Sequence, residues 1–246
     1  KHSGMLAYCV QCGLPKESYL AHDHPLQQAI RRAVAHFTAV PEASLITGID
    51  GCSAPNYGVP LACLAQAFAR LAADGADPEY GRAPGILAGA MTAHPEMVSG
   101  DGRNDLALME AGRGDWVTKI GAEGLQAIGV RSRGLGIAIK VADGAKRGLH
   151  PATVEVLDQL GLNTTALPAL TRTEQEVLTQ RQELTYNFNT AVEAAEGEPD
   201  RGGDLEACVL PGQQNARCRE RVEDEIAGRG EEGEPDEEKS RIGAAR

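Results

Sequence analysis

Two apolar runs in the middle of the chain, residues 125–131 and 135–142, restrict its possible folds more than any other segment. Ser132, Arg133 and Gly134 separate the two runs. Apolar runs of strand length joined by a short turn with glycine predict a β-hairpin, because glycine adopts the positive φ of such a turn without steric cost. We therefore expect an antiparallel sheet at the centre of the fold.

The second run predicts two unlike faces for that sheet. Side chains alternate along a strand, so Ile137 and Ile139 lie on one face while Gly136 and Ala138 lie on the other. A face of small residues lets another element approach closely. Helical spacing of apolar residues predicts helices over residues 2–12, 25–37, 60–75, 84–94, around 106–109, 152–160 and 171–185. The expected fold class is α/β (α+β), an antiparallel sheet with flanking helices.

The charge is unevenly distributed along the 246 residues. The formal net charge of −11 argues against a nucleic-acid-binding surface, which needs clustered lysine and arginine. From Glu193 onward there are 16 acidic and 8 basic residues, a net of −8, and hydrophobic periodicity is lost. Such a segment buries too little apolar surface to offset the entropy of ordering. We expect a folded domain over residues 1–192 and a disordered acidic tail over 193–246.

The six cysteines do not indicate a disulfide framework, because the chain is long enough to build a core without bridges. No run of about 18 apolar residues is present, so no membrane span is predicted, and the first residues do not resemble a signal peptide. We therefore expect a cytoplasmic protein that does not bind membranes. Cys9 and Cys12 form a CxxC motif, which is either half of a zinc knuckle or one face of a helix.

Segment 47–60 predicts a shaped loop, because three glycines and two prolines surround the carboxylate of Asp50 and the thiol of Cys52. An acid and a soft sulfur two positions apart on such a loop are able to converge on a metal ion or a polar ligand. The alternative is a tight turn with a buried cysteine, since free cysteines behave as small hydrophobic residues.

Two other segments are candidates for a site. The Gly-Asp-Gly turn that precedes Arg103 is a candidate ligand loop, although the same tripeptide is common in plain turns. Lys119 stands before a glycine-rich stretch on an expected edge strand, from which its amine is able to reach a cleft. A surface lysine is the alternative.

Seven motifs together resemble the class 3, rhizobial-type L-asparaginases, which have a serine-β-lactamase-like fold. They occur in the order of that family over residues 1 to about 165. The matching segments are Lys1-His-Ser-Gly-Met-Leu-Ala, His24-Pro-Leu-Gln, Gly48-Ile-Asp-Gly-Cys, Tyr57-Gly-Val-Pro-Leu, Gly102-Arg103, Lys119-Ile-Gly-Ala-Glu-Gly124 and Leu135-Gly-Ile-Ala-Ile-Lys-Val-Ala-Asp-Gly144.

The resemblance implies hydrolysis of L-asparagine to L-aspartate and ammonia, and it makes a homodimer plausible. In the family, serine hydroxyls paired with lysine amines form the catalytic centre. A serine is a weak nucleophile until a base removes its proton, and a lysine acts as that base only when its amine is neutral. Lys119 matches the family's lysine before Gly-Ala-Glu-Gly, so we assign it the role of catalytic base or proton shuttle. Arg103 is assigned to substrate binding.

The resemblance also implies a zinc ion beside the substrate pocket. Lys1 and Cys52 map to zinc ligands, and Asp50 lies close to the metal or to the ammonium of the substrate. His2 is expected to line the pocket. A lysine ligand binds as the neutral amine, so metal binding at this site should depend on pH.

The chain departs from the family pattern at both ends, and its C-terminal tail does not follow the family's ending. The family has Cys-Ser-Gly before the lysine that matches Lys1, and the Ser-x-x-Lys motif lies further upstream. We therefore expect an N-terminally truncated domain with an uncovered sheet edge, a partial zinc site and little activity alone. Asn104 replaces a family cysteine. Two other hypotheses are open: a related serine hydrolase of glutaminase or penicillin-recognising type, and a decayed, non-catalytic interaction module.

Overall fold

The computed structural model describes residues 1–162, 164, 165, 167 and 205–211. Within these residues the chain forms seven α-helices, two short 3₁₀ turns and six strands. In chain order they are α1 His2–Cys12, α2 Pro25–Thr38, η1 Glu42–Ser44, β1 Ile46–Ile49, β2 Pro55–Gly58, α3 Leu61–Ala72, α4 Ala83–Ala93, α5 Glu96–Ser99, α6 Asn104–Gly112, β3 Trp116–Ile120, β4 Leu125–Val130, η2 Arg131–Arg133, β5 Leu135–Val141, α7 Lys146–Gln159 and β6 Leu205–Pro211.

A four-stranded antiparallel sheet with the order β3-β4-β5-β6 forms the centre of the fold. The predicted hairpin is confirmed as β4 and β5, which pair from Leu125 opposite Lys140 to Val130 opposite Leu135. The turn between them is η2 followed by Gly134, whose φ of 55° is the positive value expected for glycine at this point. The predicted fold class, mixed α/β with an antiparallel sheet and flanking helices, is confirmed.

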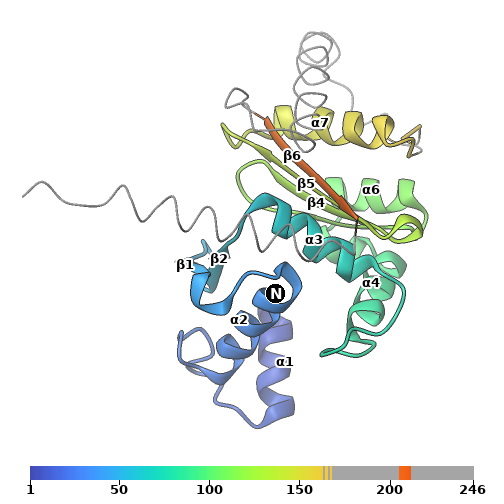
Figure 1. Ribbon diagram of the computed structural model, residues 1–246. Coiled ribbons are helices and arrows are strands. Elements are labelled where there is room, and N and C mark those ends of the chain that lie inside the picture. The colour runs from blue at the N-terminus through green and yellow to red at the C-terminus, as the bar shows by residue number, and fades with distance from the viewer. Residues whose placement is uncertain (163, 166, 168–204, 212–246) are drawn as a thin grey trace, which may run out of the picture.

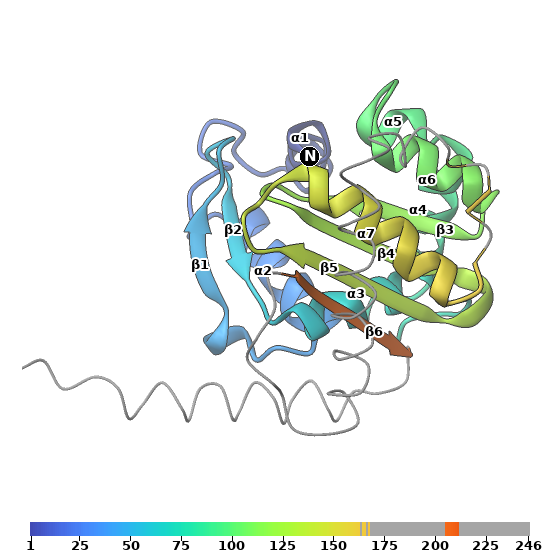
Figure 2. The same ribbon diagram turned by 90° about the horizontal axis from the view of Figure 1, so that it is seen from above.

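Helices cover both faces of this sheet (Figure 1). On one face, α6 and α7 enclose the main hydrophobic core, which includes Ile137 and Ile139 from β5 and Leu149 and Leu157 from α7, all fully buried. Figure 2 shows α7 lying across β4 and β5, with the small β1–β2 hairpin beside the main sheet. On the opposite face, α3 packs against β4, β5 and β6.

The approach of α3 depends on two glycines that are register partners, Gly129 of β4 and Gly136 of β5. A Cβ atom at Gly129 would lie 2.5 Å from the carbonyl oxygen of Phe68, and one at Gly136 would overlap the carbonyl oxygen of Ala65. The residues of α3 that are buried there are mostly alanines, including Ala65 and Ala69. The predicted small-residue face therefore receives the backbone of a helix directly.

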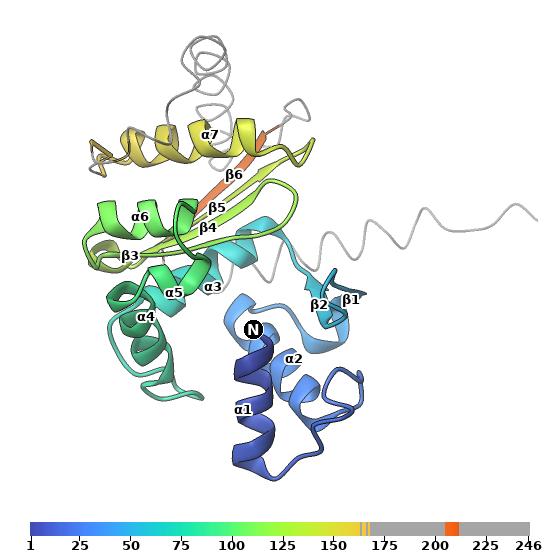
Figure 3. The ribbon, with the colours of Figure 1, turned by 180° about the vertical axis from the view of Figure 1, so that it is seen from behind.

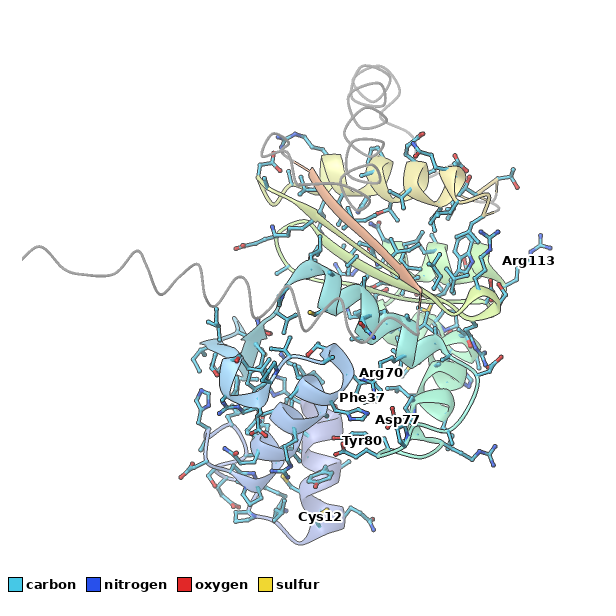
Figure 4. The ribbon with its side chains drawn as sticks, viewed as in Figure 1. Cys12, Phe37, Arg70, Asp77, Tyr80 and Arg113 are labelled. Atoms are coloured by element: carbon cyan, nitrogen blue, oxygen red, sulfur yellow. The ribbon has the colours of Figure 1, made fainter. Side chains whose placement is uncertain are left out.

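The helices α1 and α2 lie on the side of α3 away from the sheet (Figure 3). A polar cluster joins the end of α2 to α3 and to the loop before α4. His36 Nε2 and Arg70 Nη2 both contact the carboxylate of Asp77, at 2.9 and 3.2 Å, and His36 Nδ1 lies 3.0 Å from Glu79. The Arg70 guanidinium stacks over Phe37, and the labelled side chains of Phe37, Arg70 and Asp77 lie close together in Figure 4.

Residues 205–211 lie within the tail for which we predicted disorder. They form β6, which pairs along the whole of β5 from Val141 opposite Leu205 to Leu135 opposite Pro211. A strand thus lies within the stretch for which we predicted disorder, and it pairs with the edge of β5. The net composition of the tail concealed a short apolar stretch, Ala-Cys-Val-Leu, which gains backbone hydrogen bonds at a sheet edge. The rest of 193–246 lies outside the described residues.

Most predicted helices are confirmed, as α1, α2, α3, α4 and α6. The helix expected over 152–160 begins earlier, at Lys146, and contains Pro151 in its second turn. Leu149 is fully buried in the core, which holds the turn before the proline in helical form. The helix expected over 171–185 lies outside the described residues. In the described part of the chain, each helix is too short or too polar to cross a membrane.

Candidate active site

The predicted loop 47–60 is the β1–β2 hairpin, and Asp50 stands at its tip. Asp50 N donates to Ala54 O at 2.9 Å, and Ser53 N donates to Asp50 O at 2.8 Å. The turn places Ser53 at a φ of 66°. Gly51 N donates to Asp50 Oδ1 at 2.7 Å, so the backbone of the turn orients the carboxylate.

Three predicted site residues converge at this tip. Lys1, which caps the start of α1, donates from Nζ to Asp50 Oδ2 at 2.7 Å across a sequence separation of 49 positions. The thiol of Cys52 donates to the same oxygen at 3.6 Å. All three side chains are exposed or half-exposed, and Cys52 is a free thiol. The sequence alternative of a buried cysteine in this turn is therefore wrong.

The ion pair shifts the pKa values of both Lys1 and Asp50. Hydrogen bonding to Asp50 raises the pKa of the Lys1 ammonium, slight burial opposes this, and Cys52 adds to the increase. The hydrogen bond from Lys1, followed by that from Gly51 N–H, holds the pKa of Asp50 below its usual value. At neutral pH the tip therefore carries a carboxylate anion and an ammonium cation in contact.

The donor set at this tip fits a partial zinc site. An amine nitrogen, a carboxylate oxygen and a thiol sulfur are all donor types that Zn²⁺ accepts. Among the described residues, no group of three or more histidine, cysteine, aspartate or glutamate side chains is placed to hold a metal ion. The tip therefore supplies three metal donors only if the amine of Lys1 is one of them. To bind a metal ion, that amine must first lose its proton and its contact with Asp50.

His2 follows Lys1 in the first turn of α1, and its Nδ1 is hydrogen-bonded to Tyr19 Oη at 2.8 Å. The two rings meet edge to face. Tyr19 is held in turn through its backbone, because its carbonyl accepts from the buried amide of Gln27 at 2.7 Å. The His2 ring therefore has a defined orientation next to Lys1.

Lys119 lies on β3, an edge strand as predicted, and its side chain is 47% exposed. Its Nζ donates to Ile120 O at 2.7 Å and lies 3.5 Å from Asp105 Oδ2. Arg103 immediately precedes α6, and Arg103 Nε donates to Ser99 O at 3.1 Å. Asp105 occupies the first turn of α6. The side chains of Lys119 and Arg103 thus make these contacts within the α5–α6–β3 region, whereas Lys1, Asp50 and Cys52 meet at the β1–β2 tip.

The CxxC motif spans the last turn of α1. Cys9 is fully buried in a small core with Met5 and Leu26, whereas Cys12 is exposed at the far end of the helix (Figure 4). For Cys9, the structure therefore agrees with the prediction that the motif forms one face of a helix.

Sequence reasoning missed two residues of this region, Tyr19 and Asp105. Tyr19 contacts His2 across 17 positions, and Asp105 contacts β3 and β4 across 13 to 21 positions. A local pattern carries no signal for such contacts. The one available hint is that Asp105 is an acidic residue in a first helical turn, which is common for electrostatic reasons alone.

The comparison with known families agrees with the motifs. No curated protein matches the chain. A family profile described as L-asparaginase II matches residues 1–187, which include all of the candidate site residues. Because this match covers well over half of the 246 residues, the chain belongs to the L-asparaginase II family.

Proposed function

We propose that this protein is an amidohydrolase that converts L-asparagine and water to L-aspartate and ammonia. The observation that carries the proposal is the convergence of Lys1, Asp50 and Cys52, because these residues match family motifs and come from segments far apart in the chain. Family membership supports the amide hydrolysis in general, and the composition of the tip supports a small, charged substrate.

Each candidate residue has a role that its surroundings allow. Asp50, which is anionic, offers a carboxylate to the ammonium of the amino-acid substrate. Arg103 is exposed and offers a guanidinium to a substrate carboxylate. His2 lines the pocket next to Lys1 in the orientation that Tyr19 holds. Lys119 is the proton acceptor for the nucleophile, and it returns the proton to the departing ammonia.

Zinc is part of the same proposal. Lys1 Nζ, the Cys52 thiolate and an Asp50 oxygen would hold the ion, and a bound Zn²⁺ supplies positive charge that polarises a carbonyl oxygen. Asp50 has one carboxylate for two partners, so a metal ion and the Lys1 ammonium compete for it. A homodimer and a cytoplasmic location complete the proposal, and light scattering of the purified chain tests the dimer.

The test measures binding and turnover separately. Titration calorimetry with L-asparagine, L-aspartate and L-glutamine measures binding, and a coupled assay measures ammonia in the same preparations. We expect L-asparagine to bind more tightly than L-glutamine and Asp50→Asn to weaken that binding, because the substrate ammonium loses its anionic partner. Lys119→Ala should leave binding intact. Any ammonia release should be lost in Lys119→Ala, because this variant removes the proposed proton acceptor.

Glu123→Gln is the matched control for these variants, because Glu123 is exposed in the turn after Lys119. It should behave as the unaltered chain in both assays. Equal binding of L-asparagine by the unaltered chain and by Asp50→Asn would refute the assigned site. Preference for L-glutamine would instead favour the glutaminase hypothesis.

A further inference from the structure

Asp105 has a fully enclosed carboxylate, with 0% of its side chain exposed. A buried carboxylate is costly unless hydrogen bonds replace its water. Asp105 stands in the first turn of α6, and the groups that replace water come from β3 and β4.

The contacts of Asp105 bracket Lys119. Asp105 Oδ1 accepts from Thr118 Oγ1 at 3.2 Å and from Gln126 Nε2 at 3.1 Å, and Oδ2 accepts from Ile120 N at 3.0 Å. Thr118 and Ile120 are the two neighbours of Lys119 in the chain. Because β3 is an edge strand of the sheet in the described part of the chain, the Ile120 N–H has no strand partner there on that side, and the carboxylate takes the place of one.

The same carboxylate faces the lysine amine. Lys119 Nζ lies 3.5 Å from Asp105 Oδ2, and it also donates to Ile120 O at 2.7 Å. Asp105 is sealed from solvent, whereas Lys119 is 47% exposed. One end of the pair is thus fixed in the protein, and the other end reaches the surface where a reactant has access.

We infer that Asp105 is a positioning residue for Lys119: it holds β3 on both sides of the lysine, through the Thr118 hydroxyl and the Ile120 N–H, and provides a fixed anion beside its amine. This inference rests on the proposed role of Lys119 in amide hydrolysis. When Lys119 accepts a proton from the nucleophile, the ammonium forms beside a carboxylate that is already in place. Such preorganised charge needs no rearrangement during the reaction.

The test measures the chemical reactivity of Lys119 and does not depend on turnover. The full chain is acetylated briefly with acetic anhydride, and the modified fraction of each lysine is measured by mass spectrometry. Lys140 serves as the internal reference. Its Nζ donates to two backbone carbonyl oxygens, Glu123 O at 2.5 Å and Val141 O at 2.9 Å, and the substitution of Asp105 alters neither of these acceptors. In Asp105→Asn we expect Lys119 to be acetylated about threefold faster relative to Lys140, since the variant removes the ion pair that holds the amine, and a pair with a half-exposed lysine is worth about that factor.

Thr118→Val is the matched variant, because it removes a hydrogen bond to Asp105 and keeps the charge. It should leave the relative acetylation of Lys119 unchanged. If Asp105→Asn does not fold, the unaltered chain gives the answer: 1 M NaCl screens the pair and should raise the relative acetylation of Lys119. An unchanged ratio in folded Asp105→Asn, or in 1 M NaCl where that variant does not fold, would overturn the inference.

Turnover separates this inference from the proposed function. Asp105→Asn should lower kcat for ammonia release about tenfold and leave KM for L-asparagine unchanged, because the carboxylate acts on the proton acceptor and makes no contact with substrate. A KM effect without a kcat effect would contradict the inference. If Lys119→Ala keeps its ammonia release while the acetylation result holds, the proposed function fails and the Asp105–Lys119 pairing stands.

Discussion

Gly136→Ala should destabilise the protein strongly, because the sheet and α3 touch at this glycine. A Cβ atom at Gly136 would lie 2.7 Å from both Ala65 C and Ala69 N, whereas ordinary contacts of this kind lie at 3.4–4 Å. The difference between 2.7 and 3.4 Å means that the helix must withdraw by about 0.7 Å, and the overlap with Ala65 O requires still more. The opposing atoms belong to the backbone, so no side-chain rotation relieves the contact.

The expected cost follows from that geometry. Adding one methyl group to a packed core typically costs about 1–3 kcal/mol, and we expect about 3 kcal/mol here, since the backbone of α3 has to move against β4, β5 and β6 together. At this chain length that free energy lowers Tm by about 6–12 °C. The measurement is urea unfolding followed by circular dichroism and by the fluorescence of Trp116, the chain's one tryptophan, which is buried in the core.

Gly85→Ala is the matched control. Gly85 lies inside α4, and a Cβ atom there would have no neighbour within 4 Å. Alanine is the better helix former, so this variant should gain up to about 1 kcal/mol. A Gly136→Ala protein with the unfolding midpoint of the unaltered chain would refute the reasoning, because it would mean that α3 does not rest on the glycine pair.

Two further predictions concern charge. Burial alone would raise the pKa of Asp77, but hydrogen bonds from His36 and from two backbone amides outweigh it and hold that pKa well below its ordinary value. The ionised form therefore stabilises the fold above the unfolded-state pKa of about 4, and this contribution is lost as the pH falls through the lower folded-state value. Asp77→Asn should cost about 3 kcal/mol at pH 7, and the gap to the unaltered chain should narrow below pH 4 in unfolding titrations; a gap independent of pH would contradict the assignment. Zinc affinity, measured by competition with an indicator, should be weak, should rise with pH as Lys1 deprotonates and should fall in Cys52→Ala; tight binding without Cys52 would exclude the tip.

Local patterns were sufficient for much of the fold. The hairpin of β4 and β5 followed from two apolar runs and a glycine, because strand alternation and turn geometry are properties of adjacent residues. The same holds for α2, which begins at the expected proline with His24 as its cap, accepting from Leu26 N at 3.2 Å. The family motifs placed Lys1, Asp50 and Cys52 in one site before any contact between them was known.

Tertiary structure decided what depends on distance in the chain. Composition pointed to disorder at residues 205–211, yet the exposed edge of β5 offers this stretch backbone partners that its own neighbours lack. Likewise, Asp105 resembles any acidic residue at a helix start, and only the packing of α6 on β3 buries it beside Lys119. Charge, propensity and spacing are local quantities, whereas burial and pairing arise when segments far apart in sequence exclude water together.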